Sequence, residues 1–401
     1  MTPGNKPVRV LIVDDEPDIE ALIRQRFRKR LEEYNFVFAR NGEEALQRLS
    51  EDPELALVIT DINMPVMDGL ALLERLNGLD GRLVKAVILS AYGDMRNIRA
   101  AMNGGAFDFL TKPLDFRDFE KTIRRTQEAL DATRRGLQAR EELAALEQEL
   151  EIAARIQASI LPRESAPREA PYEIYAEMKP ARQVGGDFYD FFVIGEHRLG
   201  FVIGDVSGKG IPAALYMAVC RTLLRATALQ NLSPGECLEY ANQVLYGQGE
   251  AGVFVTVFYG ILHTDTGLVE YAIAGHNPPY RISAALERIE RPGGAVAGLL
   301  PGLTYETGAL SLLPGDSIFL FTDGVTESMD AEGKFLGERR LCEALGALRS
   351  ATPKEMVRGI LNAVDEFSAG APQSDDVTAM TVKWAPAAAP EDRRLKPPTA
   401  R

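Results

Sequence analysis

The sequence predicts a multidomain protein: an N-terminal α/β unit with a doubly wound, five-stranded parallel sheet, a long helical linker, and a C-terminal α+β sandwich flanked by helices. The chain has 401 residues, too many for one typical core. Short β-branched runs alternate with amphipathic stretches up to about residue 127, whereas hairpin-like pairs dominate from residue 172 onward. A polar, helix-favouring run separates the two patterns.

Five strand-like runs define the N-terminal unit, and each is followed by an amphipathic helical stretch. The runs are VRVLIVDD, NFVFA, LALVITD, KAVILSA and FDFLTK. Strands that alternate with helices form parallel sheets covered on both faces. In such sheets ligands bind at the carboxyl ends of the strands.

One long helix is expected from about Phe116 to Leu161, where neither proline nor a strand signal interrupts the run and Gly136 is the one glycine. Within this helix, Ile123, Leu130 and Leu137 keep a seven-residue spacing, one register away from the 3-4 spacing that begins at Leu143. A coiled-coil seam, and so a homodimer, is one interpretation; a helix docked on its own domain is the other. The seam would consist of positions at a 3-4 spacing, namely Leu143, Leu146, Leu150, Ala153, Gln157 and Ile160.

The C-terminal region contains two predicted hairpins, DFYDFFVI with LGFVIGDV and VFVTVFYGIL with LVEYAIAG, and helices near 210–229, 233–246 and 353–369. Three prolines in LPRESAPREAP mark its start. The tail APAAAPEDRRLKPPTAR has little to bury and is expected to be disordered. The predicted ranges are 1–122 for the N-terminal α/β unit, 123–161 for the helical linker, 162–384 for the C-terminal sandwich and 385–401 for the disordered tail.

Composition narrows the class of protein. Hydrophobic residues make up 46% and charged residues 26%, which is typical of globular proteins. No apolar run reaches the roughly 20 residues of a membrane helix, and the first residues lack a signal-peptide core, so we expect a cytoplasmic protein that does not enter membranes. The net charge of -13 argues against nucleic acid as a partner. Three cysteines without C-x-x-C spacing indicate buried thiols.

Polar residues gather at the predicted strand ends of the N-terminal unit. Crowded carboxylates repel one another unless a cation joins them, and oxygen ligands suit Mg²⁺. The alternative is an acidic rim with a structural ion pair, which would not explain why all five residues lie at the ligand edge. The five are Asp14, Asp15, Asp61, Ser90 and Lys112.

This stretch resembles the receiver domain of two-component response regulators over about 120 residues. The resemblance implies that Asp61 accepts the phosphoryl group from a sensor histidine kinase. Further roles follow from the same resemblance: Asp15, Asp61 and the main-chain carbonyl of Asn63 as Mg²⁺ ligands, Asp14 supporting through water, Lys112 and Ser90 contacting the phosphate, a cis Lys112-Pro113 peptide, and Phe109 as a side chain that swings inward with Ser90.

Acidic residues also end several strands of the C-terminal region. Asp187 lies in VGGDFYD, and Asp205 follows eighteen residues later in GDVSGKG, on the partner strand of a predicted hairpin. Asp323 lies in FLFTDGVTE, and Asp375 and Asp376 lie in QSDDVTAM. One such acid is usually a turn former, whereas four at strand ends favour a metal site. An acid-rich region with three histidines favours Mg²⁺ or Mn²⁺ over zinc, and no Cys-x5-Arg loop supports thiol chemistry.

These phrases, with AGHNPP at 274–279, resemble the metal-dependent PPM (protein phosphatase 2C-like) family in its bacterial branch of sigma-factor regulators, which implies a PPM-type β-sandwich. The segment GGAVAGLLPG departs from that branch's pattern. The resemblance implies two Mn²⁺ or Mg²⁺ ions with these ligands and neighbours: Asp205 bridging both, Asp323 and Asp375 on the first, Asp187 and the main-chain carbonyl of Val206 on the second, Asp376 behind them, Arg182 on the substrate phosphate, and His276 with Asn277 in a structural turn rather than as a general acid.

The combined interpretation is a response regulator whose phosphorylated receiver controls a serine/threonine phosphatase. The resemblance implies a phosphorylated anti-anti-sigma (STAS-type) substrate in a partner-switching pathway. The alternative is a pseudophosphatase adaptor that sequesters a partner, but such proteins lose metal-binding acids that are all present here. A diguanylate cyclase, suggested by GGDFY, would need an upstream strand with a metal-binding Asp and would leave FTDGVTE and SDDVT unexplained.

Overall fold

The structure is a computed structural model that describes residues 7–79, 81–91, 94–162, 169–248, 252–290 and 292–386. The chain divides into two compact units, Met1–Leu146 and Glu147–Arg401. The predicted disordered tail, apart from residues 385 and 386, lies outside the described residues.

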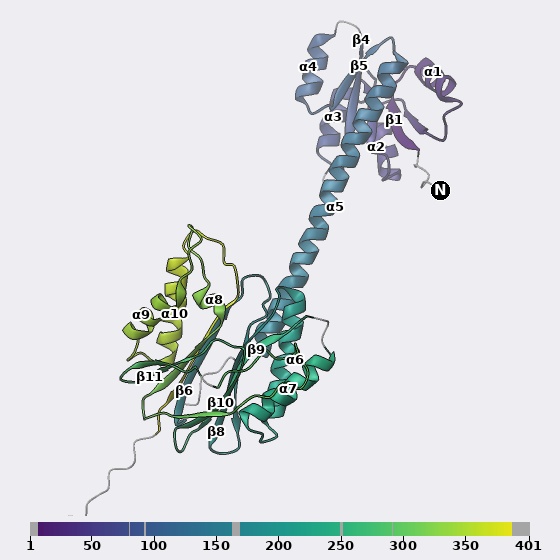
Figure 1. The fold of residues 1–401 in the computed structure, drawn as a ribbon. Helices are drawn as coiled ribbons and strands as arrows, with labels where there is room; N and C mark the ends of the chain where they lie inside the picture. The colour runs from purple at the N-terminus through teal and green to yellow at the C-terminus, as the bar shows by residue number, and fades with distance from the viewer. Residues whose placement is uncertain are drawn as a thin grey trace, which may run out of the picture. The chain divides into compact units, whose positions relative to one another are not determined.

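The first unit is a parallel sheet with strand order β2-β1-β3-β4-β5 and helices on both faces (Figure 1). This confirms the predicted doubly wound fold. Its elements are β1 (Val8–Val13), α1 (Pro17–Phe27), β2 (Tyr34–Ala39), α2 (Gly42–Glu51), β3 (Leu57–Asp61), α3 (Gly69–Asn77), β4 (Lys85–Ala91), α4 (Met95–Asn103) and β5 (Asp108–Lys112).

Each face of this sheet has its own apolar core. On one face, side chains of α2, α3 and α4 pack against Leu11 and Val58 of the sheet. On the other, α1 and the start of the long helix pack against Val10 and Ile12. Burial on both faces explains why the strands are continuous apolar runs. The carboxyl ends of the strands therefore form a defined edge.

The long helix α5 (Phe116–Ile160) confirms the predicted linker helix. Its first turns belong to the first unit, where Phe119, Ile123 and Leu130 are completely buried. Residues 132–149 are all exposed, Gly136 among them. No atom of the described residues beyond the helix backbone would lie within 4 Å of a Cβ added at Gly136.

The second unit is a sandwich of two sheets, with strand orders β13-β10-β9-β8-β7 and β12-β11-β14-β15-β6. Both predicted hairpins are present, because β7 pairs with β8 and β9 pairs with β10. The strands are β6 (Tyr172–Lys179), β7 (Phe188–Ile194), β8 (Arg198–Val206), β9 (Val255–His263), β10 (Leu268–Ala274), β11 (Tyr280–Ile282), β12 (Leu286–Arg288), β13 (Gly308–Ser311), β14 (Ser317–Phe321) and β15 (Val377–Trp384).

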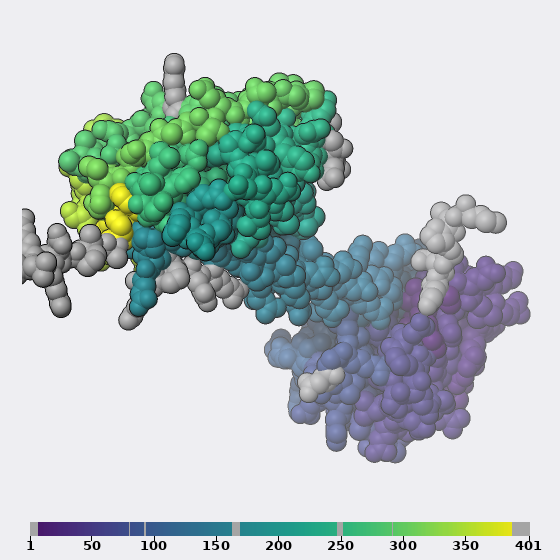
Figure 2. Space-filling model, turned by 90° about the horizontal axis from the view of Figure 1, so that it is seen from below, coloured from purple at the N-terminus to yellow at the C-terminus, as the bar shows by residue number. Residues whose placement is uncertain are grey.

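Helices cover the two outer faces of this sandwich. They are α6 (Ile211–Ala228) and α7 (Pro234–Gln248) on the first sheet, and α9 (Gly337–Ala347) and α10 (Pro353–Phe367) on the second, with the short α8 (Asp323–Thr326) against β15. The antiparallel pair β6 and β15 brings the start and end of the unit side by side, as the teal and yellow surfaces in Figure 2 show.

A buried ion pair fastens α6 to β7. Asp190, the last residue of VGGDFYD, is fully buried and pairs with Arg221 at 2.9 Å and with Arg225 at 3.0 Å. Arg225 also lies over the ring of Phe192, 5.1 Å from its centroid. The second acid of the motif is thus a structural anchor for α6.

Among the described helices, none combines the length and the apolar character that crossing a bilayer requires. The cytoplasmic location stays a prediction.

Candidate functional site

The two glycines of VGGDFYD allow three chain segments to meet. A Cβ on Gly185 would lie 2.3 Å from a carboxylate oxygen of Asp376, and one on Gly186 would lie 2.7 Å from the main-chain oxygen of Val206. A side chain at position 186 would require the backbone to move, and one at position 185 would push the Asp376 carboxylate out of its hydrogen bonds. The glycines therefore place Asp187 beside both the end of β8 and the loop before β15.

Asp376 holds the main chain of this loop. Its Oδ1 accepts a hydrogen bond from Ala181 N at 2.8 Å, and its Oδ2 accepts one from Gly186 N at 2.7 Å and a longer one from Asp187 N at 3.4 Å. Hydrogen bonds to an ionised acceptor are stronger than neutral ones. Asp376 thus fixes the loop that carries Asp187, which gives a physical role to an acid that the sequence placed behind the ligands.

The C-terminal end of α5 holds the same loop. The buried Gln157 side chain donates from Nε2 to the carbonyl of Gly185 at 2.7 Å, and its Oε1 accepts from Gly185 N at 3.1 Å. The sequence had placed Gln157 in a dimer seam. At this end of the seam the helix is instead docked on its own domain, because the amide satisfies two buried main-chain groups.

Asp187 is fully buried, and its Oδ2 accepts hydrogen bonds from two hydroxyl groups. Thr322 Oγ1 donates at 2.7 Å and Thr378 Oγ1 at 2.6 Å. Burial raises the pKa of Asp187 well above its usual value, and the nearby charge of Asp205 raises it further. The two threonines stabilise a carboxylate whose ionised form is otherwise costly in this place.

Asp205 and Asp323 extend the acidic site. Burial, followed by the charges of Asp323, Asp375 and Asp376, raises the pKa of Asp205 to about 7. The pKa of Asp323, at the start of α8, is raised by burial and then by Glu327 and Asp375. Carboxylates that raise each other's pKa in this way are stabilised by a shared cation. The donor set therefore fits one or more hard divalent ions.

Asp375 is turned toward solvent and pairs with Lys209, whose Nζ lies 2.9 Å from Asp375 Oδ2. With Asp187 turned to its threonines and Asp375 to Lys209, the C-terminal acids are more widely spaced than the N-terminal ones. In the described ranges of the chain, the one group of three or more acids whose oxygens all lie within 4.8 Å is Asp14, Asp15 and Asp61. The four C-terminal ligand roles stay predictions.

Two other predicted residues lie near the C-terminal acids. Arg182 is exposed, and its Nη1 lies 3.8 Å from where a Cβ on Gly210 would be, at the N-terminus of α6. His276 is buried after β10, and its Nδ1 lies 2.8 Å from Thr256 Oγ1. Burial lowers the pKa of His276 to about 4, so its imidazole is neutral near pH 7.

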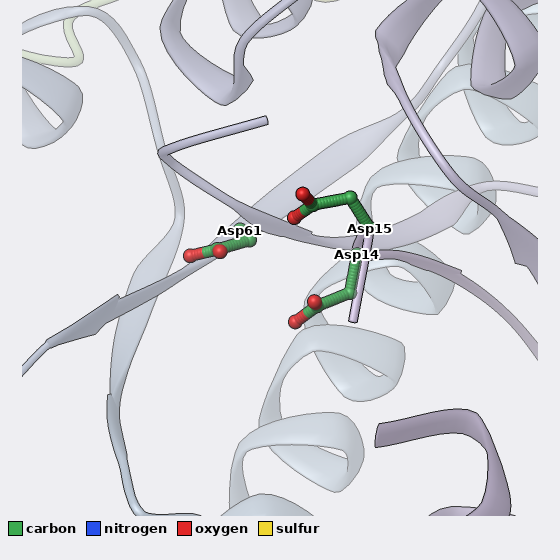
Figure 3. A group of neighbouring side chains, drawn as sticks. All are labelled: Asp14, Asp15 and Asp61. Atoms are coloured by element: carbon green, nitrogen blue, oxygen red, sulfur yellow. The ribbon is translucent and has the colours of Figure 1, made fainter. Parts of the chain in front are cut away.

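At the edge of the first unit, Asp14 and Asp15 follow β1 and Asp61 ends β3, so their carboxylates lie side by side (Figure 3). Lys112 at the end of β5 pairs with Asp14 at 2.9 Å, Asp61 at 3.0 Å and Glu16 at 3.0 Å. Burial raises the pKa of Asp14. Although burial opposes the ammonium, hydrogen bonds to the three carboxylates raise the pKa of Lys112. This donor set fits Mg²⁺.

The remaining predicted residues of this unit surround that edge. Ser90 is buried in β4, Phe109 is partly exposed in β5, and Asn63 is exposed two residues after Asp61. The Lys112-Pro113 peptide is cis, as predicted.

Sequence reasoning missed four residues that hold the sites together. Thr322 and Thr378 belong to the quoted phrases FTD and DDVT, but a threonine beside an acid carries no signal that it faces another segment. Lys209, within GDVSGKG, and Glu16, directly after Asp15, were likewise not selected. A polar Gln157 in an otherwise apolar spacing was the one available signal for the loop contact.

The adjacent acids Asp375 and Asp376 allow a test of this geometry. We expect Asp376→Asn to lower the free energy of unfolding of the second unit by about 2 kcal/mol, because an amide cannot replace an ionised acceptor of several main-chain N–H groups. The matched change Asp375→Asn, at a partly exposed ion pair, should alter it by less than about 0.5 kcal/mol. Thermal unfolding of the full chain in EDTA measures both. Equal losses would contradict the role of Asp376.

Two family models match the chain. Residues 195–385 match the family described as Stage II sporulation protein E (SpoIIE), and residues 10–124 match the response regulator receiver domain. The two matches lie in different units of the structure.

Among curated proteins, the chain is 31% identical over 263 residues to Protein IcfG of Synechocystis sp., a match that covers 58% of this chain and 41% of that protein. It is 32% identical over 234 residues to phosphoserine phosphatase RsbU of Bacillus subtilis, covering 58% of this chain and 68% of RsbU. The chain thus spans less than half the length of IcfG and about two thirds of RsbU.

Among solved structures, the SiaA-PP2C domain of Pseudomonas aeruginosa matches with a TM-score of 0.54 and 21% identity. The match covers 60% of this chain and 98% of that domain. This likeness shows the fold, a PP2C-type sandwich, and confirms the fold class predicted for the C-terminal region.

Proposed function

The chain belongs to the phosphatase family of RsbU and stage II sporulation protein E, with a receiver domain ahead of the phosphatase domain, and from this premise we propose that it is a receiver-controlled, metal-dependent phosphoprotein phosphatase. The observation that carries the proposal is the mutual repulsion of Asp187, Asp205 and Asp323 in a partly buried site. A purely structural site gains nothing from such repulsion, whereas a site for divalent cations requires the charge.

The chain's own residues have separable roles in this reaction. Asp205, Asp323 and Asp375 would hold the cations from one side, with Asp187 and the Val206 carbonyl from the other. A pair of Mg²⁺ or Mn²⁺ ions supplies Lewis acidity and an activated water for hydrolysis of the phosphate ester.

Positively charged side chains near the start of α6 bind the substrate phosphate in this proposal. Arg182 lies close to Gly210, and Lys209 precedes that residue. A guanidinium group binds a phosphate through two parallel hydrogen bonds, which fixes its orientation.

The proposed substrate is a phosphoserine or phosphothreonine protein of the anti-anti-sigma (STAS) type. RsbU is named a phosphoserine phosphatase, and its similarity to this chain supports the same class of ester here. The receiver domain supports a sensor histidine kinase as the phosphodonor to Asp61. A homodimer through the exposed part of α5 completes the proposal, since residues 132–149 include Leu137, Leu143 and Leu146 without buried contacts.

Control by the receiver would pass along α5. Near its start the helix packs in the receiver core through Phe119, and near its end Gln157 holds Gly185, two residues before Asp187. A shift or rotation of α5 would therefore change the main-chain position of a predicted metal ligand. Coupling of this kind requires one structural element whose position both sites influence. α5 meets this requirement because it is a single uninterrupted helix.

The first test concerns catalysis. Asp205→Asn should reduce Mn²⁺-dependent hydrolysis of a phosphoserine protein on the order of 100-fold or more, because the central carboxylate of the acidic site loses its charge. The control Asp265→Asn, at an exposed turn residue, should keep the wild-type rate. Phosphate release from phosphorylated STAS-type proteins measures both. Equal rates for Asp205→Asn and wild type would favour the adaptor that binds a partner without catalysis.

The second test concerns the input. Asp61→Ala should leave basal hydrolysis in place and abolish its stimulation by acetyl phosphate, because the substitution removes the proposed phosphoacceptor. The same phosphate-release assay, with and without the phosphodonor, measures the stimulation. Stimulation that survives in Asp61→Ala would exclude this residue as the input.

The third test concerns transmission. Gln157→Leu should reduce phosphodonor stimulation at least about fivefold, since both hydrogen bonds to Gly185 are lost. Gln148→Leu, at an exposed position of the same helix, is the matched control and should keep the stimulation. If the two variants respond alike, α5 does not act through Gln157.

A further inference from the structure

Thr256 lies directly opposite Asp205 on the neighbouring strand. Antiparallel pairing of β8 and β9 aligns Asp205 with Thr256, so the two side chains project from the same face of the sheet. Both are partly exposed, whereas their neighbours Val206 and Val255 are buried on the opposite face. Thr256 therefore lies beside Asp205 on the sheet, although no sequence motif selects it.

The hydroxyl group of Thr256 is in hydrogen-bond contact with His276. The imidazole is buried, and its Nδ1 lies 2.8 Å from Thr256 Oγ1. Because burial lowers its pKa to about 4, the ring carries one N–H near pH 7.

The environment of the other nitrogen decides where that hydrogen lies. A main-chain hydrogen bond to Phe321 partly offsets the effect of burial on the pKa of His276, and because Nδ1 contacts Thr256 we assign the ring proton to the buried Nε2. With the proton on Nε2, Nδ1 is an acceptor, and Thr256 donates to it.

In this arrangement the side chains of Asp205 and Thr256, at opposite positions of paired strands, are both acceptors. A hydroxyl has one hydrogen, and Thr256 gives it to His276; the carboxylate of Asp205 has none once it holds a cation. Asp205 and Thr256 therefore cannot bond directly to each other. They require a donor between them.

We propose that His276 fixes Thr256 as an acceptor-only oxygen, and that Thr256 thereby positions a water of the hydrated divalent cation beside Asp205. Mg²⁺ and Mn²⁺ keep part of their water shell in protein sites, and such water donates hydrogen bonds. Thr256 is thus a positioning residue, and His276 sets its orientation. The inference rests on the proposed metal site but not on the identity of the substrate.

The test measures binding of Mn²⁺ alone, by titration calorimetry of the full chain with Asp15→Asn added throughout to weaken the receiver's own site. In this background, Thr256→Val should weaken Mn²⁺ binding at the phosphatase site about tenfold, as loss of an outer-shell hydrogen bond does elsewhere. Thr256→Ser, which keeps the hydroxyl, should restore it. His276→Leu should act in the same direction as Thr256→Val.

Thr222→Val is the matched control, because Thr222 is an exposed threonine whose hydroxyl donates to a helix carbonyl, Ala218 O. It should bind Mn²⁺ as the background does. Thr256 is partly exposed in a strand, where valine is well tolerated, so the valine variant is expected to fold. Thermal unfolding of each variant verifies this.

The inference is overturned if Thr256→Val binds Mn²⁺ within twofold of the background, or if Thr256→Ser is weakened as much as Thr256→Val. Failure of the proposed function has a different signature: binding that depends on Thr256 together with no hydrolysis of any phosphoserine protein. A chain that binds no Mn²⁺ at this site overturns both.

Discussion

The hydrogen bonds from the main chain around Gly186 to the carboxylate of Asp376 are the interaction on which the C-terminal site depends. They hold the loop before β7 of one sheet against the loop before β15 of the other, and glycine at positions 185 and 186 leaves room for this close approach. Every other feature of the site follows from this approach. Asp187 is buried because the loop is held inward, and its burial requires the hydroxyl groups of Thr322 and Thr378.

At the strand ends of the receiver unit, carboxylates also crowd together, but there a lysine neutralises more of their charge. Three carboxylates meet at strand ends, and a single lysine, Lys112, pairs with two of them. In the C-terminal site Lys209 pairs with the outermost acid, Asp375. The inner acids are left with hydroxyl groups and with each other, and burial, together with the neighbouring negative charges, raises the pKa values of Asp187 and Asp205. The two sites therefore differ in how much of their charge the protein itself neutralises.

The sequence predicted those parts of the structure that local patterns determine. Alternating strands and helices, the two hairpins and the uninterrupted helix follow from periodicity, and the acids at strand ends follow from abrupt changes in polarity. Contacts between distant segments were not predictable in this way. Gln157 meets Gly185 because the end of α5 packs on the loop before β7, and Thr256 meets His276 because the chain stays beside β9 after β10; no spacing along the chain encodes either contact. The predicted dimer seam included Gln157 for the same reason, because an apolar spacing does not show which surface will cover those residues.

The exposed middle of α5 also has a mechanical consequence. Residues 132–149 of the helix are all exposed, so its stiffness there comes from backbone hydrogen bonds, intrinsic propensity and contacts within the helix such as the Arg134–Asp131 ion pair. Gly136, the weakest helix former in that segment, costs roughly 1 kcal/mol relative to alanine and touches nothing that could compensate. Bending or fraying is cheapest at this point. If α5 transmits the proposed control, the compliance of Gly136 would limit how much torque the connection could carry before it bends.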